Sequence, residues 1–108
     1  MNRGFKVISD SMNPLIKVGD TLTVSAQQEY YRTFDVVLFK RSANLVVHYI
    51  WRDQLETNSS FITRSLKNIY FDEEPVAKDE IVGKVINYRI GMLLKLKIII
   101  LCILTGNI

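Results

Sequence analysis

The first ninety positions of this chain carry short runs in which apolar and polar residues alternate, separated by polar stretches. Alternation with a period of two, in runs rich in β-branched and aromatic residues, predicts β-strands with one buried face. Gly19 and Asp20 are typical of a tight turn, and Gly83 inside a run indicates a bulge or bend. The runs that predict strands are residues 5–9, 21–24, 34–40, 45–51, 61–64 and 81–90, with a hairpin link at 41–44 and mostly loop over 53–60 and 65–80.

Many short strands with turn signals between them predict an all-β fold, either a small sandwich or a partly open barrel of mostly antiparallel strands. A different pattern follows, because residues 92–104 are apolar except for Lys95 and Lys97. This run predicts a C-terminal apolar helix. We therefore expect one β domain over residues 1–90 and a C-terminal apolar segment over residues 91–108.

The C-terminal segment allows two interpretations. As a helix, residues 92–104 would span roughly 20 Å, which is short against a bilayer core of about 30 Å. Lys95 and Lys97 could extend to a membrane interface, so we expect membrane association through an anchor or a partly inserted helix. The alternative is that the segment packs its apolar face on the domain. Together with Arg89, the two lysines would place the domain in the cytoplasm.

The composition excludes several classes of function. With 48% apolar and 23% charged residues, the chain is expected to fold, and a net charge of +3 without a basic cluster gives no indication of nucleic-acid binding. The single cysteine, Cys102, cannot form an intramolecular disulfide, and no secretory signal peptide is recognisable. Scattered carboxylates with one histidine and one cysteine show no metal-ligand spacing, and the dispersed glycines form no phosphate loop, so no metal or cofactor is expected.

Two serines at the end of the first predicted strand are candidates for chemistry. If residues 5–11 are extended, Ser9 and Ser11 lie on one face, just before a turn at Pro14. A nucleophile and an oxyanion donor can be both exposed and rigidly held at such a strand end. The plain alternative is that both are ordinary turn serines. Asp10 lies on the opposite face and is expected to be exposed to solvent.

The only histidine, His48, lies in a predicted strand on the same face as Val46 and Ile50. A lone histidine on an apolar face is commonly structural, so its position leaves that role and the role of a general base both open. The order of several motifs along the chain adds support for a role of His48 as a general base. Residues 9–20, with the pattern Ser-x-Ser-Met-x-Pro followed by Gly-Asp, resemble the nucleophile box of signal peptidases and self-cleaving repressor proteases. Other boxes of that family are matched in order by residues 34–40, 46–48, 62–64, 72, 75–76 and 81–85.

The resemblance implies a role for each candidate residue. Ser11 would be the nucleophile and His48 its general base, as in the histidine-bearing branch found in the endoplasmic reticulum and in spore formers. Asp72 would orient the imidazole, although it could equally be a solvated acid in an acidic patch. The Ser9 hydroxyl and the Ser11 backbone N–H would form the oxyanion hole. An imidazole has a reference pKa of about 6.5, so it does not need the apolar pocket that a lysine base requires.

Three hypotheses about function follow. The first is a serine endopeptidase of the signal-peptidase type, processing a signal peptide or small precursor peptide that lies extended along a sheet edge. The second is a non-catalytic peptide-binding module, which is favoured by Leu66 where the family has aspartate and by Tyr49 where an arginine follows the histidine. The third, a self-cleaving regulator, ranks last because few residues precede the first strand. Signal peptidases work on the outer face of the membrane, in conflict with the charge pattern, so the side of the membrane stays open.

Overall fold

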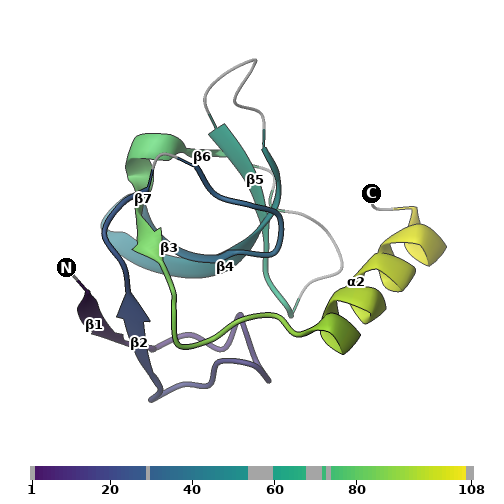
Figure 1. Ribbon diagram of the computed structural model, residues 1–108, viewed down its shortest axis with the longest axis horizontal. Coiled ribbons are helices and arrows are strands. Elements are labelled where there is room, and N and C mark those ends of the chain that lie inside the picture. The colour runs from purple at the N-terminus through teal and green to yellow at the C-terminus, as the bar shows by residue number, and fades with distance from the viewer. Residues whose placement is uncertain (1, 29, 54–59, 68–71, 73, 107–108) are drawn as a thin grey trace.

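A computed structural model describes residues 2–28, 30–53, 60–67, 72 and 74–106. The prediction of an all-β fold with a C-terminal helix is confirmed (Figure 1). One sheet has the order β1-β2 and the other the order β6-β5-β4-β3-β7, both antiparallel, and they do not close into a barrel, which fits a small sandwich. The elements are β1 (Arg3–Lys6), β2 (Thr21–Val24), β3 (Val36–Arg41), β4 (Asn44–Asp53), β5 (Ser60–Arg64), β6 (Val76–Ala77), the 3-10 helix η1 (Lys78–Glu80), β7 (Ile81–Lys84) and α2 (Met92–Thr105).

The long strand β4 is the centre of the larger sheet. Its first part, residues 44–49, pairs with β3 through a tight hairpin, and its last part, from Tyr49 to Asp53, pairs with β5 on the other edge. Within the described residues, no strand therefore pairs with the second edge of β4 over residues 44–48. This leaves a stretch of strand with backbone groups available on one side.

Alternation along β4 divides its side chains between two hydrophobic clusters. Val47 and Tyr49 belong to a cluster that also contains residues of the N-terminal turn and of α2, while Ile50 belongs to a second cluster between β3, β5 and β7. Val46 packs against this second cluster, so His48 lies on that face, as the sequence predicts. The pattern fixes which side of the sheet the histidine occupies.

The first strand is shorter than the sequence predicts. β1 ends at Lys6, and the pairing continues only through Val7, which exchanges backbone hydrogen bonds with Gly19 and Asp20. Gly19 has a φ of 93°, in the left-handed region that glycine adopts without strain. The expectation that Ser9 and Ser11 share one face of a strand is therefore wrong, because residues 8–10 lie outside this pairing and Ser11 begins a turn.

The last strand is also shorter than predicted, because the chain changes its partner. β7 ends at Lys84, after which Val85 bridges to Val24 of β2. The side chain of Asn87 then accepts a hydrogen bond from the Thr23 N–H at 2.8 Å. Residues 65–80 include the short elements β6 and η1, which the sequence analysis did not predict, and the other described residues of this range are loop as expected; residues 54–59, 68–71 and 73 lie outside the described residues.

Gly83 lies opposite a register shift in β3, between Leu38 and Phe39, as expected for a bulge in this region. A Cβ atom at this position would lie 1.9 Å from the carbonyl oxygen of Ser25. The close approach of two backbones therefore requires glycine here.

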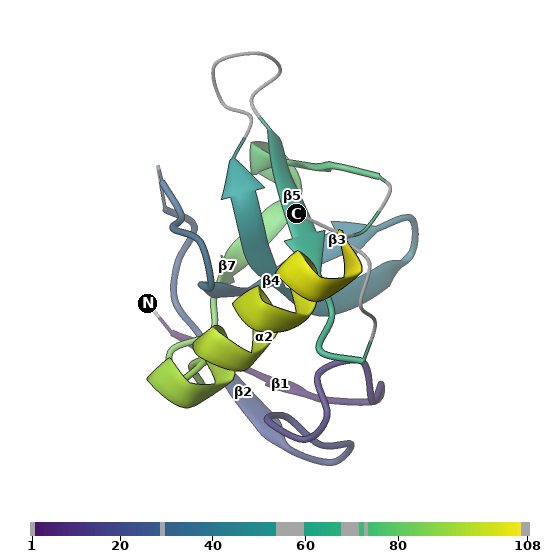
Figure 2. The same ribbon diagram turned by 90° about the vertical axis from the view of Figure 1, so that its right-hand side faces the viewer.

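Helix α2 agrees with the predicted C-terminal helix and lies across the outside of the β domain, in front of β4 (Figure 2). Ile98 and Cys102 are buried in the same cluster as Tyr49, so the helix packs on the domain. Most of its other apolar side chains are exposed. None of the helices in the described part of the chain has the length and apolar character needed to cross a bilayer.

Candidate functional site

A groove of about 590 Å³ runs between residues 5–9, at the end of β1 and just after it, and residues 43–48 of the β3–β4 hairpin. Ser9, Ser11 and His48 all line this groove, together with mostly apolar side chains. One wall is the segment that leaves the smaller sheet, and the other is the part of β4 with an unpaired edge. The fold thus brings the two serines that follow β1 and the histidine of β4 to one cavity.

The turn at Ser11 is held mainly through its backbone. The carbonyl oxygen of Ser11 accepts hydrogen bonds from the N–H groups of Leu66, at 3.0 Å, and Lys67, at 3.2 Å. The Ser11 hydroxyl donates to the carbonyl of Val47 at 3.5 Å, which is a long and weak hydrogen bond. These two backbone hydrogen bonds therefore fix the turn, and the Ser11 hydroxyl contacts Val47, the residue that precedes His48.

The two groups expected to form an oxyanion hole are neighbours. The Ser11 N–H donates to the hydroxyl oxygen of Ser9 at 3.3 Å. A substrate oxygen that entered here would replace the Ser9 oxygen as the acceptor for this N–H, and the Ser9 hydroxyl could then donate to the same oxygen. Both donors are thus present, and at rest they are turned toward each other.

His48 and Asp72 form a close pair. The distance from Nδ1 of His48 to Oδ2 of Asp72 is 2.6 Å, and both side chains are partly buried. The hydroxyl of Thr63 in β5 donates to the same oxygen at 2.6 Å, and the Asp72 N–H donates to the Thr63 carbonyl at 2.8 Å. Because Nδ1 faces the carboxylate, Nε2 is the ring nitrogen left to exchange a proton with a substrate or nucleophile.

The surroundings of Asp72 favour its ionised form. Burial by itself raises the pKa of this carboxyl group. Hydrogen bonds from His48 and Thr63 lower the pKa, and so does electrostatic attraction to the His48 ring and the Arg41 guanidinium. Together these effects outweigh burial, so the pKa of Asp72 lies below its ordinary value of 3.8. An ionised carboxylate at this position fixes the tautomer of the imidazole and stabilises an imidazolium.

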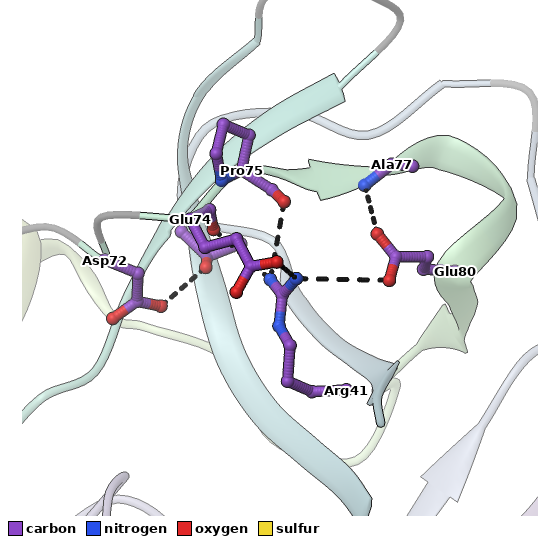
Figure 3. Close-up of polar contacts among 7 residues, drawn as sticks. Arg41, Asp72, Glu74, Pro75, Ala77 and Glu80 are labelled. Atoms are coloured by element: carbon purple, nitrogen blue, oxygen red, sulfur yellow. Dashed lines mark hydrogen bonds and ion pairs between the residues drawn. The ribbon is translucent and has the colours of Figure 1, made fainter. Parts of the chain in front are cut away.

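Arg41, at the end of β3, joins the segment after Asp72 to the rest of the sheet (Figure 3). Its guanidinium lies 3.2 Å from the Glu74 carboxylate and donates to the carbonyl oxygens of Glu74, at 3.2 Å, and Pro75, at 3.4 Å. It also lies 3.9 Å from the carboxylate of Glu80 in η1. Arg41 therefore holds the backbone two and three positions beyond Asp72.

The structure brings together only some of the residues selected from the sequence. His48 and Asp72 are in contact, and Ser9 and Ser11 lie in the same groove as His48. Within the described residues, no hydrogen bond joins the Ser11 hydroxyl to the His48 ring. Asp10 is exposed, as expected, and forms an ion pair with Lys67 at 2.6 Å that the sequence analysis missed.

Thr63 and Arg41 also belong to the site but were not selected from the sequence. Thr63 lies in one of the matched boxes, residues 62–64, but no role was assigned to it, because threonine is common in strands. Arg41 lies beside a hairpin turn, where a charged residue is ordinary. Their roles depend on contacts with Asp72 and the residues after it, which are distant in sequence.

The two positions that depart from the family pattern have structural roles here. Tyr49 is buried on the opposite face of β4 from His48 and stacks on Phe34 with ring centroids 5.9 Å apart. Burial raises the pKa of Tyr49 to about 12. The side chain of Leu66 packs against the first hydrophobic cluster, while its N–H holds the Ser11 turn.

Within the described residues, no group of three or more histidine, cysteine, aspartate or glutamate side chains is arranged to hold a metal ion. Comparisons with protein-family models, with curated proteins and with solved structures found no match for this chain. The function of the protein is therefore inferred from the residues of the groove.

Proposed function

We propose that the protein is a serine endopeptidase of the signal-peptidase type, which cleaves an extended peptide with Ser11 as nucleophile and His48 as general base. The observation that supports this best is the 2.6 Å contact between His48 and Asp72, in a groove that Ser9 and Ser11 also line. A carboxylate-bound imidazole beside a serine is the arrangement that nucleophilic acyl transfer requires.

The first step requires a rotation of the Ser11 side chain. Its hydroxyl leaves the weak bond to the Val47 carbonyl and turns toward Nε2 of His48. Catalytic hydrogen bonds are often long or absent before substrate binds and tighten in the complex. The Ser11 oxygen then attacks the scissile carbonyl carbon while its proton passes to Nε2, and Asp72 stabilises the imidazolium.

The tetrahedral intermediate carries a negative oxygen beside Ser9 and Ser11. The Ser11 N–H and the Ser9 hydroxyl donate to this oxygen in place of their present mutual contact. As the intermediate collapses, the C–N bond breaks and the imidazolium gives its proton to the leaving amine. Water, activated by His48, then hydrolyses the acyl-serine ester and releases the free acid.

The substrate would enter as an additional strand. The unpaired edge of β4 over residues 44–48 offers backbone hydrogen bonds to an extended peptide, and the apolar walls of the groove would contact alternate side chains. The resemblance to signal peptidases implies small side chains next to the cleaved bond. A signal peptide or a small precursor peptide has these properties.

A peptide-processing assay tests the proposal. We expect Ser11→Ala and His48→Ala each to abolish cleavage of an extended peptide with small residues at the cut, while circular dichroism shows that each variant keeps its fold. Ser42→Ala, in the exposed β3–β4 turn outside the groove lining, is the matched control and should cleave as the parent does. Cleavage by both site variants at the parent rate would exclude the mechanism.

One observation favours a second candidate, a peptide-binding module without catalysis. At rest the Ser11 hydroxyl donates to the Val47 carbonyl, and the Ser11 N–H donates to Ser9, so neither is directed at a substrate. A fluorophosphonate probe distinguishes the two. Labelling at Ser11, lost in Ser11→Ala, supports the peptidase, whereas peptide binding without any labelling supports the module.

A further inference from the structure

Helix α2 has two faces with different surroundings. Ile98 and Cys102, four positions apart, are buried against the domain. The opposite face carries apolar side chains at helical spacing that are 47–85% exposed: Leu93, Leu96, Ile100, Ile103 and Leu104. A continuous apolar surface of this kind on a folded domain marks an interaction site. We call these five residues the outer face of α2.

Positive charge gathers near the start of this helix. All eleven acidic residues of the chain precede Ile81, whereas four basic residues follow it, so the net charge of +3 comes from the C-terminal part. Three of those four, Lys84, Arg89 and Lys95, line a hollow of about 310 Å³ beside the start of α2. The one acidic residue in that hollow, Asp35, forms an ion pair with Lys84 at 3.3 Å.

We propose that the outer face of α2 docks on an anionic lipid surface, with the cations beside the helix contacting the headgroup phosphates. An amphipathic contact of this kind buries apolar side chains at the boundary of the acyl chains and leaves cations at the level of the headgroups. Because Ile98 and Cys102 stay in the core of the domain, the helix lies along the surface with the domain attached. This inference concerns a different surface from the groove and does not depend on the peptidase proposal.

The charge pattern favours lipid over a second copy of the chain. A symmetric dimer through α2 would bring two segments together that both carry only basic residues, with no carboxylate after Glu80 to offset them. An anionic bilayer supplies both an apolar interior and the opposite charge. The pattern therefore fits a lipid surface on both counts.

Vesicle co-sedimentation of the full chain tests this, with phosphatidylcholine vesicles with and without phosphatidylglycerol. We expect binding to the anionic vesicles that weakens with added salt. The double variant Leu96→Glu with Ile100→Glu should lose at least about tenfold in affinity, because it places charge in the apolar contact. Val18→Glu, which makes the same change at an exposed apolar residue of a distant turn, is the matched control and should bind as the parent does.

A second pair of variants isolates the charges. Lys95→Gln and Lys97→Gln should each weaken binding to anionic vesicles by about fivefold and leave binding to neutral vesicles unchanged. Circular dichroism shows whether each variant keeps its fold. Ser11→Ala should bind vesicles as the parent does, which separates this inference from the proposed peptidase.

Three results would overturn the inference. One is equal binding by the parent and the Leu96→Glu, Ile100→Glu variant. Another is a dimer in analytical ultracentrifugation that this variant abolishes, without vesicle binding by the parent. The third is binding that resists alkaline carbonate, since that would mean a helix inserted across the bilayer.

Discussion

The two sides of the groove are built differently. On the histidine side, side chains hold the chemistry, because Asp72 contacts both His48 and Thr63 and the following segment is bound by Arg41. On the serine side, the Ser11 turn is held by backbone hydrogen bonds, and its hydroxyl makes only one weak contact. The imidazole and its carboxylate are thus already in contact, whereas the backbone of the Ser11 turn is held in place and the Ser11 hydroxyl is held only weakly.

This difference indicates where activation would occur. A preorganised carboxylate and imidazole need no rearrangement when charge develops. The serine must rotate and the oxyanion donors must turn from each other to the substrate. We therefore expect substitutions on the histidine side to lower the rate of the chemical step. Substitutions on the serine side should show how much of the catalytic geometry forms only when the substrate binds.

The largest effect is expected on the histidine side. Asp72→Asn should lower kcat by about 10²–10⁴-fold with little change in KM, because an amide cannot stabilise the imidazolium or hold the same tautomer. Asp10→Asn, which removes an exposed carboxylate on the serine side, should stay within about twofold. Steady-state kinetics on one peptide measures both variants. Equal losses in the two would contradict the assignment of Asp72.

On the serine side, Ser9→Ala should lower kcat by about 10²–10³-fold, the usual cost of removing one oxyanion donor. Ser9→Thr keeps the hydroxyl and should restore most of the rate. If Ser9→Ala cleaves as fast as the parent, the Ser9 hydroxyl does not contact the oxyanion, and its bond to the Ser11 N–H is purely structural.

The histidine side should also contribute to stability in a way that depends on pH. The pKa of Asp72 in the folded protein lies below 3.8, so its stabilisation is fully present above that value and is lost as the pH falls through the folded pKa. Near neutral pH, Asp72→Asn should be less stable than the parent by about 1–3 kcal/mol. Urea unfolding at several pH values measures this, and the difference should close in acid. A gap that persists at low pH would mean that the charge of Asp72 is not its cause.

The smallest effect is expected at Arg41, a positioning residue that acts through Asp72. Arg41→Met should lower kcat by only about two- to fivefold, since the ion pairs are partly exposed. Because Arg41 helps to keep the pKa of Asp72 low, its removal should move the acid limb of the profile of folding stability against pH to higher pH, as urea unfolding at several pH values measures. Lys40→Met removes the neighbouring charge and should leave the profile unchanged, while Arg41→Lys should restore part of the shift. If the profile of Arg41→Met is the same as that of the parent, the role of Arg41 is purely structural.

The parts of the fold that were predicted correctly depend on local pattern. β2 agrees with the prediction at both ends, because Thr21–Val24 alternates cleanly between two turns. The length of the last strand was wrong, since its end depends on Val85 pairing with β2 and on Asn87 bonding to Thr23. Such contacts join residues about sixty positions apart, and the periodicity of apolar residues within one segment cannot predict them.

The residues of the candidate site also fall into two groups, those that the sequence predicted and those that only tertiary contacts identify. Ser11, His48 and Asp72 were selected because their order and spacing resemble a family pattern, and the structure brings them to one region without joining the serine to the histidine. Thr63 lies in a matched box but was assigned no role, and Arg41 was not selected, because a strand threonine and a hairpin arginine acquire significance only from the residues that they contact. Sequence order thus selected the candidate residues, and the tertiary contacts determine which of them meet.

The change of partner near Val85 has a consequence for the width of the groove. Ser25 donates its N–H to the Lys84 carbonyl and Ile86 donates to the Thr23 carbonyl, so this short crossing fastens the smaller sheet to the larger one. Neither Lys84 nor Ile86 lines the groove. This crossing lies outside the groove lining and is one of the contacts that set the distance between the two walls, so a small rotation there would widen or narrow the groove without changing any residue that lines it.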